Sequence, residues 1–135
     1  MIELSKEKPY EDACKILGLR PVANYKSYKL TDETRNFIKL ETVAKALNEG
    51  WKPTTIDPKE VRYYVWGWNY TDNRKPSGLL CVYSSDGLGD ALASVGTSLE
   101  FKDRDTAKEF ARMCKPMIVK YLFGRDDHEN FKFDF

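Results

Sequence analysis

Apolar residues recur at helical spacing in two stretches of the first half of the chain. Residues 9–19 predict a short helix that Gly18 can end, because glycine adopts the left-handed conformation freely. Residues 32–49 predict a longer helix, with Thr31 as its N-cap and Gly50 as its stop. The apolar stripe of this second helix consists of Leu40, Val43, Ala44, Leu47 and Trp51. The residues between the two helices show no strong period and predict a loop.

The middle of the chain has the pattern of strands. Residues 61–70 are its densest aromatic segment, and in a strand their side chains would alternate between two faces. One face would then be almost wholly aromatic, formed by Tyr64, Trp66, Trp68 and Tyr70. The polar residues 71–78 predict a reversal into a second strand over residues 79–83. Residues 95–102 alternate as a third strand, so the three segments predict an antiparallel meander.

From Asp103 the apolar period changes to 3.6, which predicts a third helix that ends at Gly124. Pro116 should kink or split this helix, because its ring clashes with the preceding turn and removes a donor. Residues 125–135 form a charged tail that either frays or adds an edge strand. We therefore expect an α+β domain over residues 1–124 with the element order α-α-β-β-β-α. Its helices would pack on one face of a three-stranded antiparallel sheet.

Composition narrows the function classes. With 135 residues, of which 41% are hydrophobic and 32% charged, the chain has the make-up of one globular domain. Its apolar runs fall far short of the roughly 18 residues of a membrane helix, and its first residues lack an export signal. We therefore expect a soluble protein of the cytoplasm, without a membrane partner. The net charge of +1 also lacks the basic excess typical of nucleic-acid binders.

Residue types suited to catalysis or metal binding are sparse. The three cysteines are widely spaced and fall in apolar patterns, which predicts small buried side chains at Cys14, Cys81 and Cys114. The one histidine, His128, lies in the charged tail. A metal-dependent hydrolase using Asp86, Asp90 or Glu100 is the weakest hypothesis, because residues 86–90 lack the further ligands of a phosphate or calcium loop. We expect no cofactor and no metal, and a binding protein more than an enzyme.

Several segments together carry a resemblance. They are Asp-Ala-Cys-Lys-Ile-Leu-Gly at 12–18, Ala-Lys-Ala-Leu at 44–47, Asn-Glu-Gly-Trp-Lys-Pro at 48–53, Tyr-Tyr-Val-Trp at 63–66, and residues 95–102 running into 107–110. Read together, they resemble a family of small uncharacterised proteins carried by phages and mobile elements of gut bacteria. The likeness covers most of residues 10–123 and is most specific at 48–53. That family tends to have an aspartate soon after the proline, whereas here Thr54 and Thr55 precede Asp57. The resemblance implies a shared fold and a genomic context, and no catalytic residues.

The aromatic face of residues 61–70 separates the remaining hypotheses. It either forms a core floor beneath the helices, which the usual burial of aromatic residues favours, or presents a flat surface to a partner. The leading hypothesis is a non-catalytic accessory protein that binds a protein partner, or a second copy of itself, through the sheet. The alternative is a single-stranded nucleic-acid or nucleotide-binding protein whose rings stack on bases beside cationic side chains. The candidate binding residues are Tyr64, Trp66, Trp68, Tyr70, Arg62, Arg74 and Lys75.

Overall fold

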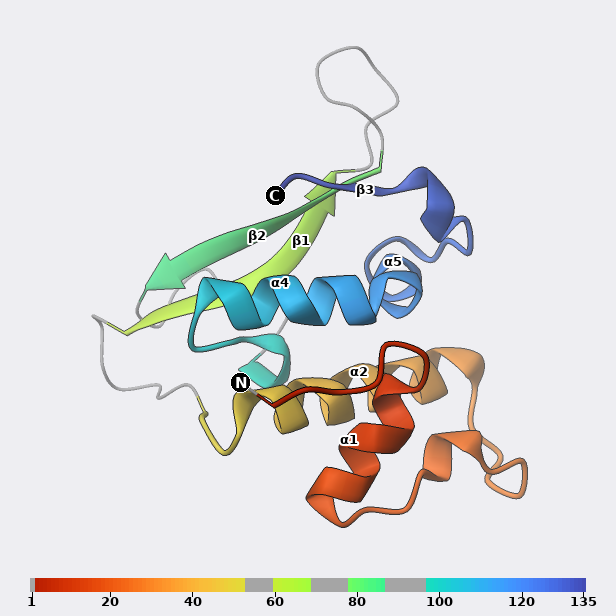
Figure 1. The fold of residues 1–135 in the computed structure, drawn as a ribbon. Coiled ribbons are helices and arrows are strands. Elements are labelled where there is room, and N and C mark those ends of the chain that lie inside the picture. Colours follow the sequence, from red (N-terminus) through yellow and green to blue (C-terminus); the bar gives the residue numbers. More distant parts are fainter. Residues whose placement is uncertain (1, 53–59, 69–77, 87–96) are drawn as a thin grey trace.

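A computed structural model describes residues 2–52, 60–68, 78–86 and 97–135, as helices stacked against a small sheet (Figure 1). The helices are α1 (Pro9–Leu17), α2 (Asp32–Asn48), α4 (Arg104–Met113) and α5 (Lys115–Phe123). The strands are β1 (Val61–Trp68), β2 (Leu79–Asp86) and β3 (Lys132–Phe133), and single 3-10 turns occur at η1 (Val22–Asn24), η2 (Thr97–Leu99) and η3 (His128–Asn130). The prediction of an α+β fold is confirmed. No helix in these described ranges has the length and apolar character needed to cross a membrane.

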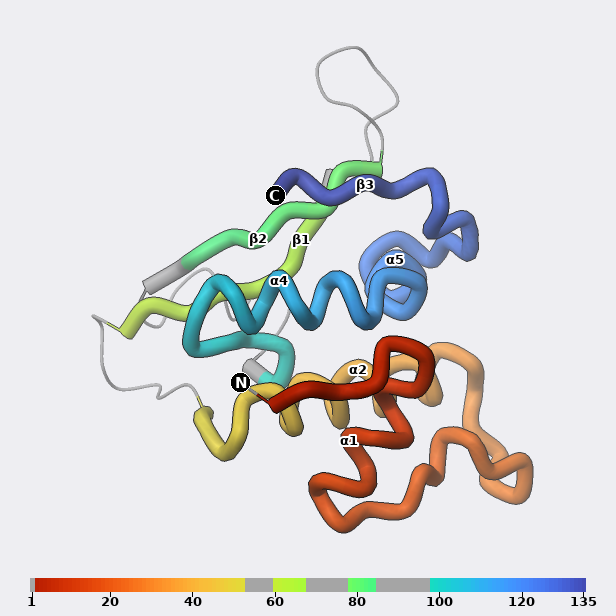
Figure 2. Tube along the Cα trace, in the orientation of Figure 1, coloured from red at the N-terminus to blue at the C-terminus, as the bar shows by residue number. Residues whose placement is uncertain are grey.

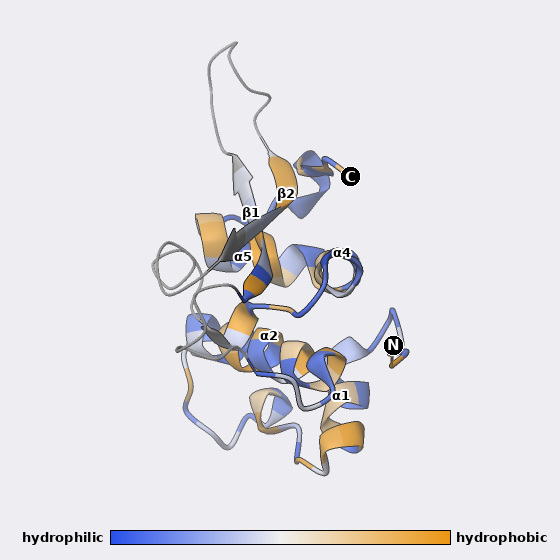
Figure 3. Ribbon diagram, turned by 90° about the vertical axis from the view of Figure 1, so that its left-hand side faces the viewer, coloured by the Kyte–Doolittle hydropathy of each residue, from blue (hydrophilic) through white to orange (hydrophobic). Residues whose placement is uncertain are grey.

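The α2 helix lies at the centre of the helical layer, between α1 and α5 (Figure 1). Its N-terminus is capped as predicted, because the Thr31 hydroxyl accepts a hydrogen bond from the backbone N–H of Thr34 at 3.1 Å. Its predicted core positions are buried at Leu40, Val43, Ala44 and Leu47. Figure 3 shows hydrophobic (orange) and hydrophilic (blue) segments alternating along α2, in the stack of helices below the sheet.

Pro116 splits the predicted third helix into α4 and α5. The proline stands in the first turn of α5, where its missing N–H removes no helical hydrogen bond. The buried Cys114 joins the two helices, so α4 lies along β1 and β2 while α5 turns away to pack on α2. Asp103 caps α4 as predicted, accepting a hydrogen bond from the backbone N–H of Thr106 at 2.8 Å. This bond and a second one from the Thr106 hydroxyl lower the pKa of the Asp103 carboxyl.

The sheet departs from the predicted meander in its third strand. β1 and β2 pair antiparallel as expected, but β3 comes from the C-terminal tail and pairs parallel with β2 (Figure 2). The sheet of the described residues is therefore mixed, with strand order β1-β2-β3. The tail occupies the free edge of β2 through two backbone hydrogen bonds. The N–H of Lys132 donates to the carbonyl of Gly78 at 2.6 Å, and the N–H of Asp134 donates to that of Leu80 at 2.8 Å. Over the described ranges the helices and strands follow in the order α-α-β-β-α-α-β, and the prediction of a purely antiparallel sheet is wrong.

The predicted third strand over residues 95–102 lies in part outside the described residues. Its described part contains η2 and then a single bridge to β1, in which Tyr63 and Phe101 exchange backbone hydrogen bonds of 2.9 and 2.8 Å. The 3-10 turn directs Leu99 into the core, and Phe101 packs its ring 4.8 Å from that of Phe110. In its described part this segment therefore packs against α4 and makes one bridge to β1, where a third strand was predicted to pair along β1.

The helices α4 and α5 cover the odd-numbered face of β1. The guanidinium of Arg104 in α4 lies 5.1 Å from the ring centroid of Tyr63, and Val65 is buried. A Cβ atom at Gly67 would stand 2.8 Å from a ring carbon of Phe123 in α5, so glycine permits this close approach. Side chains alternate along a strand, so Tyr64 and Trp66 lie on the face turned away from α4 and α5. Both side chains are nevertheless partly buried and pack against the hydrophobic core, so the interpretation of the aromatic face as a core floor stays a prediction.

Candidate functional site

The face of the sheet turned away from α4 and α5 carries a cross-strand aromatic cluster. Tyr64 is paired with Tyr83, and their rings stack with centroids 6.1 Å apart and planes 29° apart. Trp66 stands opposite Cys81 in the same register. Tyr64, Trp66 and Tyr83 are half-buried, and we call these three residues the open sheet face. Stacked cross-strand pairs stabilise a sheet and also leave an ordered aromatic surface for a partner.

The other predicted binding residues do not all join this face. The backbone of Trp68 ends β1, whereas Tyr70, Arg74 and Lys75 lie outside the described residues. Arg62 belongs to the same side of β1 as Tyr64, but its side chain has no exposed surface. It therefore does not offer a cation to a ligand there.

Arg62 instead faces Glu100 in the interior. Its Nε lies 3.7 Å from Glu100 Oε2, both side chains are 0% exposed, and within the described ranges their charged atoms make no hydrogen bond. Burial raises the pKa of the Glu100 carboxyl, and the Arg62 charge opposes part of that rise. The pair joins β1 to the segment before α4, beside the bridge between Tyr63 and Phe101. Sequence reasoning considered Glu100 only as a metal ligand, and no local pattern signals its partner.

A second candidate site surrounds Trp51, where the chain leaves α2. A cleft of about 460 Å³ opens here. Its lining includes Leu17, Glu41, Lys45, Asn48, Trp51 and Lys52. A more polar cleft of about 550 Å³ shares Asn48 and Trp51 and is otherwise lined by residues including Glu49, Lys102, Asp103 and Asp105. Trp51 thus borders two clefts, one with more basic than acidic residues in its described lining and one with more acidic than basic residues.

The backbone turn after α2 places Trp51 between these clefts. Glu49 has φ of 49°, and Gly50 follows with φ of 89°, so two successive left-handed residues reverse the chain. Trp51 N–H then donates to the Asn48 carbonyl at 2.9 Å. The sequence pattern assigned Trp51 to the α2 stripe, but the helix ends at Asn48 and Trp51 lies beyond it. The predicted stop at Gly50 is preceded by Glu49, which adopts a conformation that non-glycine residues seldom take.

The Asn48 side chain fixes the end of α2 to the segment before α4. Its Nδ2 donates to the backbone carbonyl of Glu100 at 3.0 Å. This bond sets the orientation of the amide, and its Oδ1 is buried with no hydrogen-bond donor in the described part of the chain. A buried acceptor without a donor costs free energy, so the end of α2 carries a local cost at Asn48.

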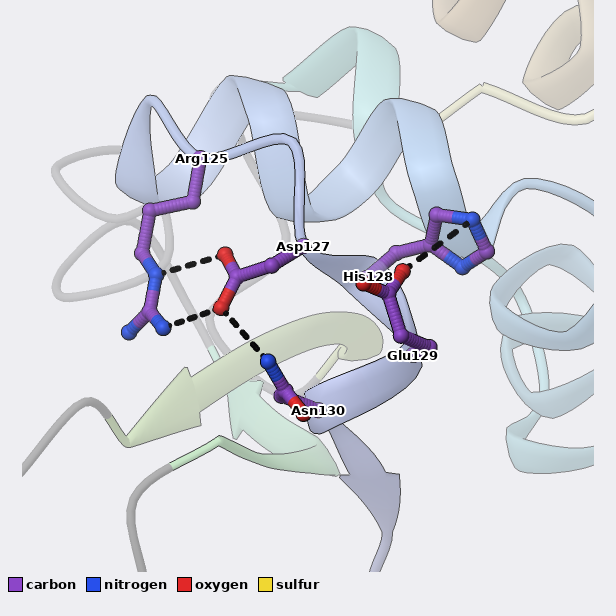
Figure 4. A network of polar contacts seen from close by, with 5 residues as sticks. All are labelled: Arg125, Asp127, His128, Glu129 and Asn130. Atoms are coloured by element: carbon purple, nitrogen blue, oxygen red, sulfur yellow. Dashed lines mark hydrogen bonds and ion pairs between the residues drawn. The ribbon is translucent and has the colours of Figure 1, made fainter.

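Figure 4 shows a polar network in the turn between α5 and β3. Arg125 donates through its guanidinium to both carboxylate oxygens of Asp127, and Asn130 Nδ2 donates to Asp127 Oδ2 at 3.0 Å. These hydrogen bonds lower the pKa of the Asp127 carboxyl. His128 Nε2 lies 3.8 Å from Glu129 Oε2. The network holds the turn that brings the tail onto the sheet.

The cysteines are buried, as predicted. Desolvation raises the pKa of the Cys114 thiol to about 12 and also raises that of Cys14. Thiols in this state are poor nucleophiles. Among the described residues no three side chains of His, Cys, Asp or Glu stand close enough to hold a metal ion.

Comparison with protein-family models, curated proteins and solved structures finds no match for this chain. The open sheet face and the clefts beside Trp51 are therefore the features of the described residues from which a function can be inferred.

Proposed function

We propose that this chain is a non-catalytic accessory protein, of the kind carried by phages and mobile elements, that binds protein through its open sheet face. The observation that carries the proposal is the stacked Tyr64–Tyr83 pair beside Trp66, on the face that α4 and α5 leave uncovered. Aromatic side chains are enriched at protein interfaces, where they bury large area at a low entropic cost. We take a second copy of the chain as the occupant.

The charge of the molecule supports self-association. Its 22 basic and 21 acidic residues give a formal net charge of +1, so two copies repel each other little. Two identical aromatic faces related by a two-fold axis are self-complementary. The alternative of nucleic-acid binding on the same face loses one of its proposed cations, because Arg62 is buried against Glu100.

Sedimentation velocity over a range of protein concentrations tests the proposal. We expect a monomer–dimer equilibrium that Tyr64→Ser combined with Tyr83→Ser weakens at least about tenfold. The matched control is Tyr25→Ser combined with Tyr28→Ser, which removes another stacked pair, with ring centroids 6.0 Å apart, before α2. A wild type that stays monomeric at high concentration, or a control that weakens the dimer equally, would overturn the proposal.

A fluorescence titration with a single-stranded oligonucleotide at low salt separates the alternative. The proposal expects no quenching of the tryptophans by the oligonucleotide. If the oligonucleotide does quench the tryptophans, and the Tyr64→Ser and Tyr83→Ser changes abolish the quenching, then the open sheet face binds nucleic acid instead of a second copy.

A further inference from the structure

The cleft of about 460 Å³ beside Trp51 has the size and surface of a small-molecule site. Ligand pockets commonly enclose about 300–1,000 Å³ and combine apolar walls with a few polar groups. Leu17 at the end of α1 and Trp51 after α2 supply apolar and aromatic surface, and Asn48 and Ser98 supply polar groups. An indole beside an apolar side chain is suited to a flat ring, which it contacts by stacking.

The charges of the cleft favour an anion. Lys45 and Lys52 both line it, and neither ammonium has a carboxylate within ion-pairing distance in the described ranges. Glu41, one helical turn before Lys45, is the one acidic side chain among the described residues that line this cleft, and these residues carry an excess of one positive charge. Lysine ammonium groups bind carboxylate or phosphate oxygens through charge-assisted hydrogen bonds.

The polar cleft on the other side of Trp51 has the opposite character. Glu49, Asp103 and Asp105 outnumber Lys102 in its lining. An anionic group there would meet three carboxylates, so the electrostatics direct it to the side of Lys45 and Lys52. The two clefts therefore define an orientation for a ligand that stacks on Trp51.

The backbone holds Trp51 in place at a cost. Glu49 adopts φ of 49°, the one left-handed non-glycine residue in the described ranges. This conformation is unfavourable for an L-residue, and such strain concentrates at ligand sites. The unsatisfied Oδ1 of Asn48 is a second local cost, on a residue that lines the cleft of about 460 Å³. Glu49 itself lines the polar cleft on the other side of Trp51.

From these observations we propose that the cleft lined by Leu17, Lys45, Asn48, Trp51 and Lys52 binds a small molecule that joins a flat apolar ring to an anionic group. The ring stacks on Trp51 and packs on Leu17, and the anion lies between Lys45 and Lys52. This site is separate from the open sheet face and does not depend on self-association.

Two-dimensional ¹⁵N NMR titrations test the site with defined probes. Indole-3-acetate and adenosine monophosphate each join a ring to an anion, while neutral indole and inorganic phosphate carry one part alone. We expect saturable shifts of the Trp51 indole N–H and the Gly50 and Ser98 amides with at least one complete probe. Its affinity should exceed that of either part by about tenfold or more. If only indole-3-acetate shifts these signals, the ligand class is an aromatic carboxylic acid. If only adenosine monophosphate does, the class is a nucleotide. If both do, the site recognises the ring and the anion that the two probes share.

The decisive variant combines Lys45→Ala with Lys52→Ala, two exposed positions whose loss leaves the core intact. We expect it to weaken the complete probe about tenfold and leave neutral indole unchanged. The matched control, Lys26→Ala with Lys29→Ala, removes the same charge before the other end of α2, about 25 Å away along the helix. No saturable shift at Trp51 by about 10 mM of either complete probe, or equal losses in both lysine variants, would overturn the proposal.

Discussion

Replacing Arg62 by methionine would leave the Glu100 carboxyl buried without the guanidinium whose Nε lies 3.7 Å from its Oε2. At an effective dielectric of about 20, two unit charges at this separation attract by about 4.5 kcal/mol. The carboxyl can take up a proton and so avoid part of this loss, because burial already raises its pKa. We therefore expect Arg62→Met to lower the free energy of unfolding by about 3 kcal/mol, at the low end for breaking a buried ion pair.

Urea denaturation followed by circular dichroism measures this loss. With an m-value of about 2 kcal/mol per molar, the midpoint should fall by about 1.5 M. The matched control is Glu109→Gln, which removes the carboxylate of a surface pair 3.6 Å from Arg112 and should cost below about 1 kcal/mol. Arg62→Met combined with Glu100→Leu should recover most of the loss, because no charge is then buried.

The pH dependence gives an independent check of the same pair. The pKa of folded Glu100 lies above its ordinary value of 4.5, so between these two values the folded chain holds a proton that the unfolded chain has lost. Stability should therefore fall as pH rises through this window, and Glu100→Gln should remove that slope. The Asp103 carboxyl has the opposite effect on stability, because its pKa in the folded chain is lowered from the ordinary value of 3.8. Below pH 3.8 the unfolded chain holds the extra proton, so stability there rises with pH. An Arg62→Met protein as stable as wild type, or a double variant no more stable than Arg62→Met alone, would refute the reasoning.

Four further substitutions or reactions test the fold. Asp103→Ala should lower the free energy of unfolding, measured by urea denaturation, by about 1 kcal/mol, because it removes the α4 cap. Asp105→Ala should lower it clearly less, and equal losses would contradict a capping role. Gly78→Ala should cost about 2 kcal/mol or more, because its φ is 79° and its Cβ would stand 2.5 Å from a backbone carbonyl of η3; a neutral result would contradict this geometry. Phe131→Ala should cost about 3–5 kcal/mol, and a small loss would show that the tail is not part of the core. Cys114 should resist a thiol reagent at pH 8 until urea unfolds the chain, and fast labelling of the folded protein would contradict its burial.

Local signals in the sequence were sufficient for the helices. The Thr31 and Asp103 caps, the 3.6-residue period and Pro116 each act within a few residues, and the structure places the helix ends accordingly. The end of α2 was harder to predict. Trp51 continues the apolar stripe of the helix, so periodicity alone cannot tell that the left-handed Glu49 has already ended it.

The arrangement of the sheet could not be predicted from local sequence patterns. Alternation divided β1 into two faces, but the face that α5 approaches depends on Gly67, whose missing side chain leaves room for Phe123. The partner of β2 depends on hydrogen bonds to a tail about fifty residues later in the chain. The Arg62–Glu100 pair likewise joins residues that no short motif connects. Tertiary contacts therefore decided each feature on which the candidate sites depend.

The central position of α2 has a consequence for the folding rate. Asn36 Nδ2 donates to the carbonyl of Met117, 81 residues later, and Asn48 Nδ2 donates to that of Glu100, 52 residues later. Contacts of such long sequence separation require closure of large loops before they contribute stability. The α1–α2 pair can form early from local contacts, but the remaining partners of α2 arrive only with α4 and α5. We therefore expect slow, loop-closure-limited folding, with an apolar side of α2 open to chaperones in the meantime.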